Sequence, residues 1–180
     1  GASGAFDRFA QTEAWYKKYT EILERLGWTS EQFAFARHDQ QEGELRMDQA
    51  ALALIAAIAT QNQLAVLNEA IQALETLAED DKTLRLFDFH TSTQASGNFQ
   101  LGAVQTTNNG ALSLALGAFH FKSHDARRRV LFVKWGAQQL EFWTAAQRLT
   151  LNTTQYATLR DAVERKLGQE AQDFIADLPL

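Results

Sequence analysis

The sequence predicts an α+β fold in which an antiparallel meander of about five strands is packed with N-terminal and C-terminal helices. Two observations support this prediction. Hydrophobic residues recur at helical spacing before residue 79 and after residue 152, whereas the segment from Thr83 to Leu151 has the period of two that is typical of strands. The links between these strands are too short for βαβ crossovers, so neighbouring strands should pair in antiparallel fashion.

The composition is that of one globular domain. The chain has 180 residues with one Pro, and 46% of its residues are hydrophobic, so nothing divides it and an ordinary core can form. Gly1 to Gly4 resemble an expression-tag remnant, which leaves residues 5–180 as a single α+β domain. The absence of Cys excludes disulfides and thiolate chemistry. A net charge of −5 argues against nucleic acid as a partner, and no apolar run reaches the ~18 residues of a membrane span.

An amphipathic helix is expected over Asp7–Leu26. Trp15, Tyr19 and Ile22 fall on one face of it, and Gly27 is well placed to end it.

Two short segments follow this helix. Gln32–His38 alternates and predicts a strand, although Thr29 and Gln32 could instead open a helix through a capping box. Leu45–Met47 is expected to form a returning strand.

The next region predicts two helices. Asp48 suits the N-cap of the first, which is apolar all round over Ala50–Ala59 and should therefore be buried. After a polar break at Thr60–Gln63, helical spacing resumes over Leu64–Ala78. A helical hairpin is favoured over one long bent helix.

Five strands are then expected, at Leu84–Phe89, Phe99–Thr106, Ala111–Lys122, Arg128–Trp135 and Leu140–Leu151. Asn109 and Gly110 tolerate the positive φ of a tight hairpin turn. The third of these strands is apolar on both faces, so it should lie at the sheet centre or be covered on both sides.

The C-terminal part predicts two helices. Asn152 and Gln155 form a capping box. The first helix carries an apolar stripe of Tyr156, Leu159, Val163 and Leu167. Gly168 is expected to end it, and Glu170–Leu178 to form a short final helix that stops at Pro179.

The sequence contains no established catalytic or cofactor motif. It lacks the phosphate-binding loops, the serine-hydrolase elbow and the His-Glu-x-x-His metal motif. His120 and His124 lie four residues apart, but two ligands do not make a metal site. Asp88 and Glu141 are more simply interpreted as solvent-facing carboxylates than as a catalytic pair. We therefore expect no cofactor, no metal and, on balance, no enzyme.

Two groups of residues are candidates for a partner or ligand surface. Arg127, Arg128 and Arg129 form a basic cluster that suits an acidic partner or a phosphate, although charge at an edge strand can simply prevent aggregation. Trp135 and Trp143 would make a binding patch if exposed together, whereas burial in the strand core is the simpler interpretation.

The leading functional hypothesis is a non-catalytic domain that binds a protein partner or assembles with itself through apolar surface. The first alternative is a small-molecule or lipid-binding domain with a cavity between sheet and helices. The second is a membrane-active, toxin-like or virulence protein with peripheral membrane contact, suggested by the apolar helix Ala50–Ala59 and the aromatic strands.

Overall fold

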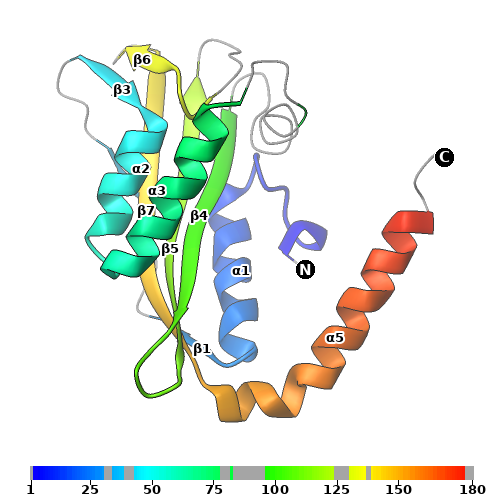
Figure 1. The fold of residues 1–180 in the computed structure, drawn as a ribbon. Coiled ribbons are helices and arrows are strands. Elements are labelled where there is room, and N and C mark those ends of the chain that lie inside the picture. Colours follow the sequence, from blue (N-terminus) through cyan, green and yellow to red (C-terminus); the bar gives the residue numbers. More distant parts are fainter. Residues whose placement is uncertain are drawn as a thin grey trace.

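The computed structural model describes residues 2–30, 34–38, 43–77, 82, 96–123, 130–136 and 139–176. Figure 1 shows a sheet with helices on both faces and a C-terminal helix that stands away from it. The elements in chain order are η1 (Ala2–Gly4), α1 (Thr12–Arg25), β1 (Trp28–Ser30), β2 (Ala36–Arg37), β3 (Glu44–Arg46), α2 (Met47–Ala56), α3 (Gln61–Glu75), β4 (Ser96–Thr106), β5 (Leu112–Ser123), β6 (Lys134–Gly136), β7 (Leu140–Leu151) and α5 (Thr153–Ala176). The α+β class is confirmed.

The main sheet is antiparallel and has five strands, as predicted, but two of its members differ from the expected set. Its order is β1-β7-β5-β4, with β2 also paired to β7. β7 therefore pairs directly with β5, while β6 leaves the sheet to pair with β3 in a separate two-stranded ribbon. The predicted strand Leu84–Phe89 lies outside the described residues.

The expected strand Arg128–Trp135 is wrong over most of its described length. Val130 and Leu131 are buried and belong to a turn rather than to a strand. The Leu131 carbonyl accepts a hydrogen bond from the backbone N–H of Asp48, and the Val130 carbonyl accepts one from the Trp135 indole. These bonds satisfy the backbone of the turn, so only Lys134–Gly136 remains in a ladder.

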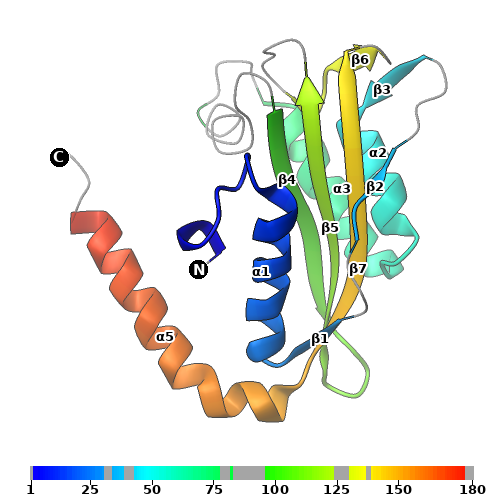
Figure 2. The same ribbon diagram turned by 180° about the vertical axis from the view of Figure 1, so that it is seen from behind.

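Helices cover both faces of the sheet, which explains the two-sided apolar pattern of β5. Helices α2 and α3 lie on the face shown in Figure 1, and α1 lies on the other, in front of the sheet in Figure 2. Phe119 packs in the core beneath α2, whereas its neighbour Ala118 packs against Trp15 and Tyr16 of α1. Neighbouring residues of a strand point to opposite faces, so β5 needs cover on both sides, as predicted.

The predicted helical hairpin is confirmed, with a cap that differs from the expected one. Thr60 and Gln63 form a complete capping box that starts α3, so the polar break between the helices is a helix start signal. At α2 the N-cap is Arg46, and Asp48 lies in the first turn. The expected N-cap role of Asp48 is therefore wrong, because its carboxylate pairs with the Arg46 guanidinium instead.

The N-terminal helix begins later than Asp7. The Asp7 carboxylate accepts hydrogen bonds from the backbone N–H groups of Phe9 and Ala10, which forms a turn before the helix. Helix α1 then starts at Thr12. Within the expected strand Gln32–His38, the described residues form a strand at Ala36–Arg37, which is β2.

The two expected C-terminal helices are one helix of 24 residues that passes through Gly168. One exposed Gly costs a helix only about 1 kcal/mol relative to Ala. Two pairs span this position: Lys166 lies 3.3 Å from Glu170, and Gln169 donates to Asp173. These i,i+4 contacts favour a continuous helix.

Candidate functional site

Helix α5 is anchored to the rest of the structure at its first turn. One residue, Asn152, separates it from β7. The Asn152 backbone N–H donates to the Gly27 carbonyl at 2.8 Å, and its side-chain oxygen accepts from the Gln155 N–H at 3.0 Å. The capping role predicted for Asn152 is thus present. Gly27 has a φ of 97°, as its predicted place at the end of α1 requires.

The remainder of α5 extends away from the body, by which we mean the elements from η1 to β7 (Figures 1 and 2). Its apolar stripe, formed by Tyr156, Leu159, Val163 and Leu167, is not buried. The first three side chains are half-buried and Leu167 is 60% exposed. A stripe of this width normally packs against a core, so this face of α5 is available to another surface.

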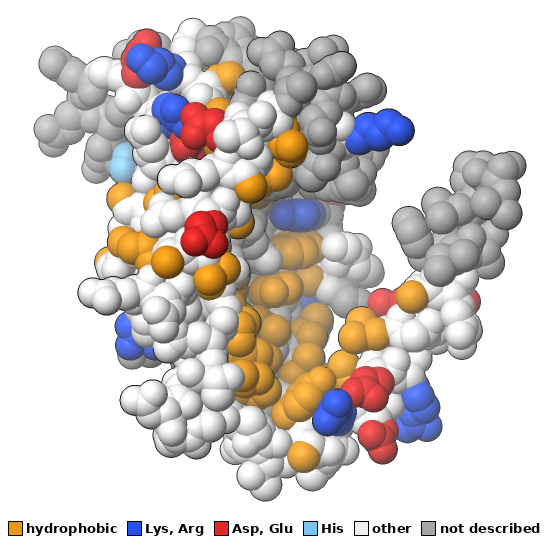
Figure 3. All heavy atoms as spheres, in the orientation of Figure 1, with side chains coloured by type: hydrophobic (Ala, Val, Ile, Leu, Met, Phe, Trp, Pro, Cys, Tyr) orange, Lys and Arg blue, Asp and Glu red, His pale blue; other side chains and the backbone are white. Residues whose placement is uncertain are grey.

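The stripe looks onto a hollow whose opposite wall is also apolar. Figure 3 shows hydrophobic side chains along the inner side of α5 and, across the hollow, over α1 and β4. We call this opposite wall, over α1 and β4, the flank. Val104 of β4, which is 55% exposed, lies on the face of the sheet that packs against α1, because its partner Leu114 alternates in step with Ala118. The Tyr16 hydroxyl of α1 donates to the carbonyl of Phe99 on β4 at 3.2 Å, which joins the two elements of the flank.

A second candidate site is a pocket of about 400 Å³ at the N-terminal end of α1. It is lined by that end of the helix and by Phe9, Phe35, His120, Lys122 and Trp143. His120 and Trp143 are cross-strand partners on β5 and β7, and their rings stack with centroids 5.1 Å apart. Stacking of this kind fixes the indole in one orientation.

The charges around Trp143 do not favour one sign. The Arg37 guanidinium and the Lys122 ammonium lie 5.9 and 5.7 Å from the centre of its ring. Arg37 is also 3.6 Å from the Glu141 carboxylate, and Glu13 lines the pocket. The pocket therefore offers aromatic surface rather than a strong electrostatic field.

Burial lowers the pKa of the His120 imidazole below its ordinary value. A hydrogen-bond contact between Nδ1 and the Gly97 carbonyl, at 3.2 Å, acts in the opposite direction. His120 is therefore mainly neutral at pH 7. Among the described residues, no three His, Asp or Glu side chains are grouped so as to hold a metal ion.

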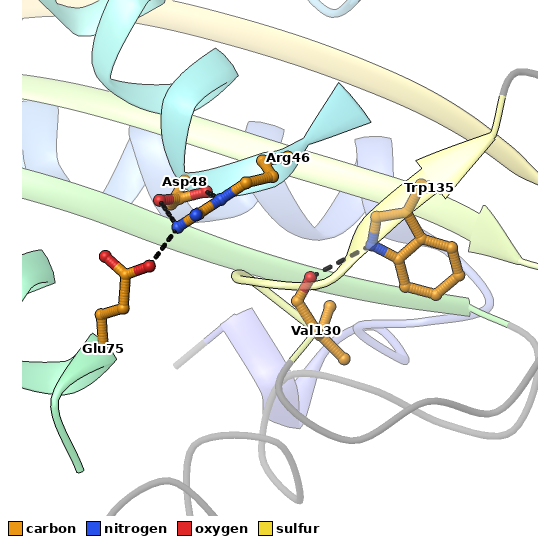
Figure 4. Close-up of polar contacts among 5 residues, drawn as sticks. All are labelled: Arg46, Asp48, Glu75, Val130 and Trp135. Carbon is orange, nitrogen blue, oxygen red and sulfur yellow. Dashed lines mark hydrogen bonds and ion pairs between the residues drawn. The ribbon is translucent and has the colours of Figure 1, made fainter. Parts of the chain in front are cut away.

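The structure separates the residues that the sequence singled out. Trp143 lines the pocket, but Trp135 is 1% exposed and belongs to the core. The Trp135 indole donates to the Val130 carbonyl at 3.2 Å (Figure 4), so the simpler interpretation, burial in the core, describes its position. Arg127, Arg128 and Arg129 lie outside the described residues, as do Asp88 and His124.

A charged cluster that the sequence did not indicate joins the two helices of the hairpin. The Arg46 guanidinium lies 2.7 Å from carboxylate oxygens of both Asp48 and Glu75 (Figure 4). The hydrogen bonds that the Arg46 guanidinium donates to Asp48 and, to a smaller extent, to Glu75 raise its pKa. The buried Asp48 is thus neutralised by a bidentate partner, which indicates a structural tie between α2 and α3 rather than a reactive carboxylate.

Comparison with known proteins gives two distant structural neighbours. No protein-family model and no curated protein matches the sequence. A solved chain described as a delta-endotoxin has a TM-score of 0.45 and 11% sequence identity, and the match covers 76% of this chain and 65% of that one. The Evf virulence factor has a TM-score of 0.39 and 13% identity, with 88% and 61% covered. The chain thus spans less than two thirds of the length of either neighbour.

Within the described residues, none of the helices combines the length and the apolar content that crossing a bilayer requires.

Proposed function

We propose that this protein is a non-catalytic binding or assembly domain that docks through the apolar stripe of α5. The observation that carries the proposal is the position of this helix. It is capped onto the body at Asn152, and its apolar stripe, half-buried at three residues and exposed at Leu167, lies beside an apolar hollow. Exposed apolar surface rimmed by polar residues marks interaction sites. The pocket that contains Trp143 is a second possible contact surface. Its described side chains do not include an acid or base held against a partner for proton transfer.

Catalysis is the weaker explanation of the same structure. The pocket at Trp143 offers a mainly neutral imidazole, and the nearby Arg37 is paired with Glu141. A catalytic site needs a nucleophile, acid or base held against a partner that tunes it. The described residues offer instead a helix whose polar side chains form ion pairs with one another and whose apolar stripe is at most half-buried.

The absence of Cys allows a direct test of the stripe. Ala171 and Gln172 are exposed on α5. Ala171 follows Leu167 by four residues and lies beside the stripe, whereas Gln172 follows Val163 by nine residues and lies on the opposite side of the helix. Each is changed to Cys and labelled with a polarity-sensitive dye. The labelled proteins are then concentrated, mixed with neutral or anionic lipid vesicles, or mixed with cell extract.

We expect the emission of the dye at Ala171→Cys to shift to the blue in at least one mixture, while the dye at Gln172→Cys remains unchanged. Equal responses of the two dyes, or no response in any mixture, would contradict docking through the stripe.

A further inference from the structure

We propose that the pocket at the N-terminal end of α1 binds a small zwitterionic molecule with an apolar body, of the class of the aromatic amino acids. The charged groups of the ligand would meet Glu13 and Lys122, and its apolar body would meet the aromatic walls of the pocket. This inference goes beyond the proposed function, because it concerns a different part of the molecule and does not depend on the stripe of α5.

The pocket has the size and the walls of a small-molecule site. Its volume of about 400 Å³ lies within the range of ~300–1,000 Å³ that is usual for ligand pockets. Phe9, Phe35 and Trp143 line it, and each side chain is half-buried, so part of each ring is open to a ligand. The Phe35 ring has an edge contact with Tyr16 at 5.1 Å, and Trp143 stacks on His120. These contacts hold two of the three aromatic walls in place before a ligand binds.

The register of the sheet brings polar groups to these walls. His120 and Trp143 lie on the face of the sheet that α1 covers, because both alternate in step with Ala118 and its partner Ala145. Lys122 follows His120 by two residues on β5 and therefore shares this face. The same pocket is bordered by the first turn of α1.

The two charged residues lie at different levels of the pocket. Helix α1 and strand β5 run in opposite directions (Figure 2), and Tyr16 packs with Ala118. Glu13 precedes Tyr16 by three residues, or about 4.5 Å of helix, and Lys122 follows Ala118 by four residues, or about 13 Å of strand. Their backbones are therefore roughly 9 Å apart along the sheet, with His120 between them. A small ligand can lie between the two charged groups.

The described residues do not neutralise these two charges. In the part of the chain that the structure describes, Glu13 forms no ion pair, and the Lys122 ammonium contacts only the face of Trp143, at 5.7 Å. After burial and the contact with the Gly97 carbonyl, the charges of Lys122 and Glu13 act on the pKa of His120 in opposite directions, so both lie near its ring. Glu13 would repel an anion and Lys122 a cation, whereas a zwitterion is complementary to both.

His120 supplies a hydrogen-bond acceptor for the cationic end of the ligand. Its Nδ1 lies 3.2 Å from the Gly97 carbonyl, which can only accept, so Nδ1 carries the proton. The neutral ring then presents Nε2 as an acceptor, and no group among the described residues donates to it. An ammonium group has three donors. It can therefore bond to Nε2 and to the Glu13 carboxylate while the carboxylate of the ligand accepts from Lys122.

Isothermal titration calorimetry with L-phenylalanine tests the proposal on the intact chain. Two analogues each lack one charge: 3-phenylpropionate has no ammonium group, and 2-phenylethylamine has no carboxylate. We expect phenylalanine to bind with a Kd of about 1 mM or lower. Each analogue should bind at least about tenfold more weakly, because it loses a charged hydrogen bond and leaves one charge of the pocket unpaired.

Variants of the two exposed charges assign the binding to this pocket. Glu13→Gln should weaken phenylalanine binding about tenfold, but it should bind 3-phenylpropionate at least as well as the native chain does, because the repulsion of the carboxylate is removed. Lys122→Met should weaken phenylalanine binding by a similar factor without weakening that of 2-phenylethylamine. Lys17→Met and Glu69→Gln, which change exposed charges outside the pocket, are the matched controls and should bind phenylalanine like the native chain. Circular dichroism checks that all four variants are folded.

Three results would overturn the proposal. The first is no heat of binding up to the solubility limit of phenylalanine. The second is binding of either analogue as tight as that of phenylalanine, and the third is phenylalanine binding that is unchanged in both Glu13→Gln and Lys122→Met. The dyes that report docking through the stripe are attached to α5, so the failure of this inference is distinct from the failure of the proposed function.

Discussion

The turn between α1 and β1 should be unusually sensitive to a single methyl group, because it carries the anchor of α5. A Cβ at Gly27 would lie 3.2 Å from the Asn152 carbonyl oxygen and 3.4 Å from the Gln155 Cβ. Gly27 also has a φ of 97°. The change Gly27→Ala therefore introduces two separate costs, one from the backbone conformation and one from the close approach of the start of α5.

Gly110 provides the matched control. It has a φ of 81°, but a Cβ there would have no atom within 4 Å. The left-handed conformation costs Ala about 1–2 kcal/mol. Ala also restricts the unfolded chain, which stabilises the folded state by about 0.4–1 kcal/mol. Gly110→Ala should therefore lower the free energy of unfolding by about 1 kcal/mol. Crowding by a few tenths of an ångström adds about 1 kcal/mol at Gly27, so Gly27→Ala should lose about 2 kcal/mol.

The free energy of unfolding, measured by urea denaturation with linear extrapolation, distinguishes these values. The corresponding falls in midpoint temperature are about 4–8 °C for Gly27→Ala and about 2–4 °C for Gly110→Ala. Hydrogen exchange should also accelerate at the Asn152 amide, which donates to the Gly27 carbonyl, in the first variant alone. Equal losses in both variants would show that the start of α5 does not lie against this turn.

Three further predictions concern the packing and the pocket. A Cβ at Gly117 would lie 2.7 Å from the Phe119 ring and 2.8 Å from the side chain of Ile55 on α2, so Gly117→Ala should lower the free energy of unfolding by about 1–3 kcal/mol. Gly168→Ala, in open space on α5, should raise it by about 0.5–1 kcal/mol. The same urea titrations check both, and a neutral Gly117→Ala would refute the close packing of α2 on the sheet. The side-chain N and O atoms of Gln147 are buried without a partner, so Gln147→Leu should be neutral or stabilising by about 1 kcal/mol in urea, and a loss of more than that would contradict the orphaned amide. The pKa of His120 is lowered in the folded chain. The contribution of His120 to the free energy of unfolding is therefore complete above the pKa of the unfolded chain, near 6.5, and falls as the pH decreases below it. Urea midpoints measured from pH 7.5 to 5 should show this fall in the native chain and a smaller one in His120→Gln.

The parts of the fold that the sequence predicted are those whose side chains carry a clear period. Leu140–Leu151 is a strand with the predicted bounds, and the apolar pattern of Ala111–Lys122 identified a strand covered on both faces. Both signals depend on local alternation, which a packed sheet preserves.

The errors arose at residues whose contacts in the structure differ from those that their residue type favours. Val130 and Leu131 are β-prone, but they are buried in a turn whose carbonyls bond to Trp135 and Asp48. Asp48 is an excellent N-cap by type, but the neighbouring Arg46 takes its carboxylate. Gly168 is a common helix terminator, but α5 passes through it.

The sequence predicted the apolar stripe of α5 but not that the stripe lies away from the core. An amphipathic stripe shows that one side of a helix needs burial, but not which surface buries it. In the described structure one face of the sheet is covered by α2 and α3, and the part of the other face around Ala118 is covered by α1. The stripe from Tyr156 to Leu167 therefore has no place on the covered sheet, and its remaining opposite surface is the flank across the hollow. A helix that is held at its first turn and stands away from the body with an apolar stripe has the geometry of an element offered to a second molecule.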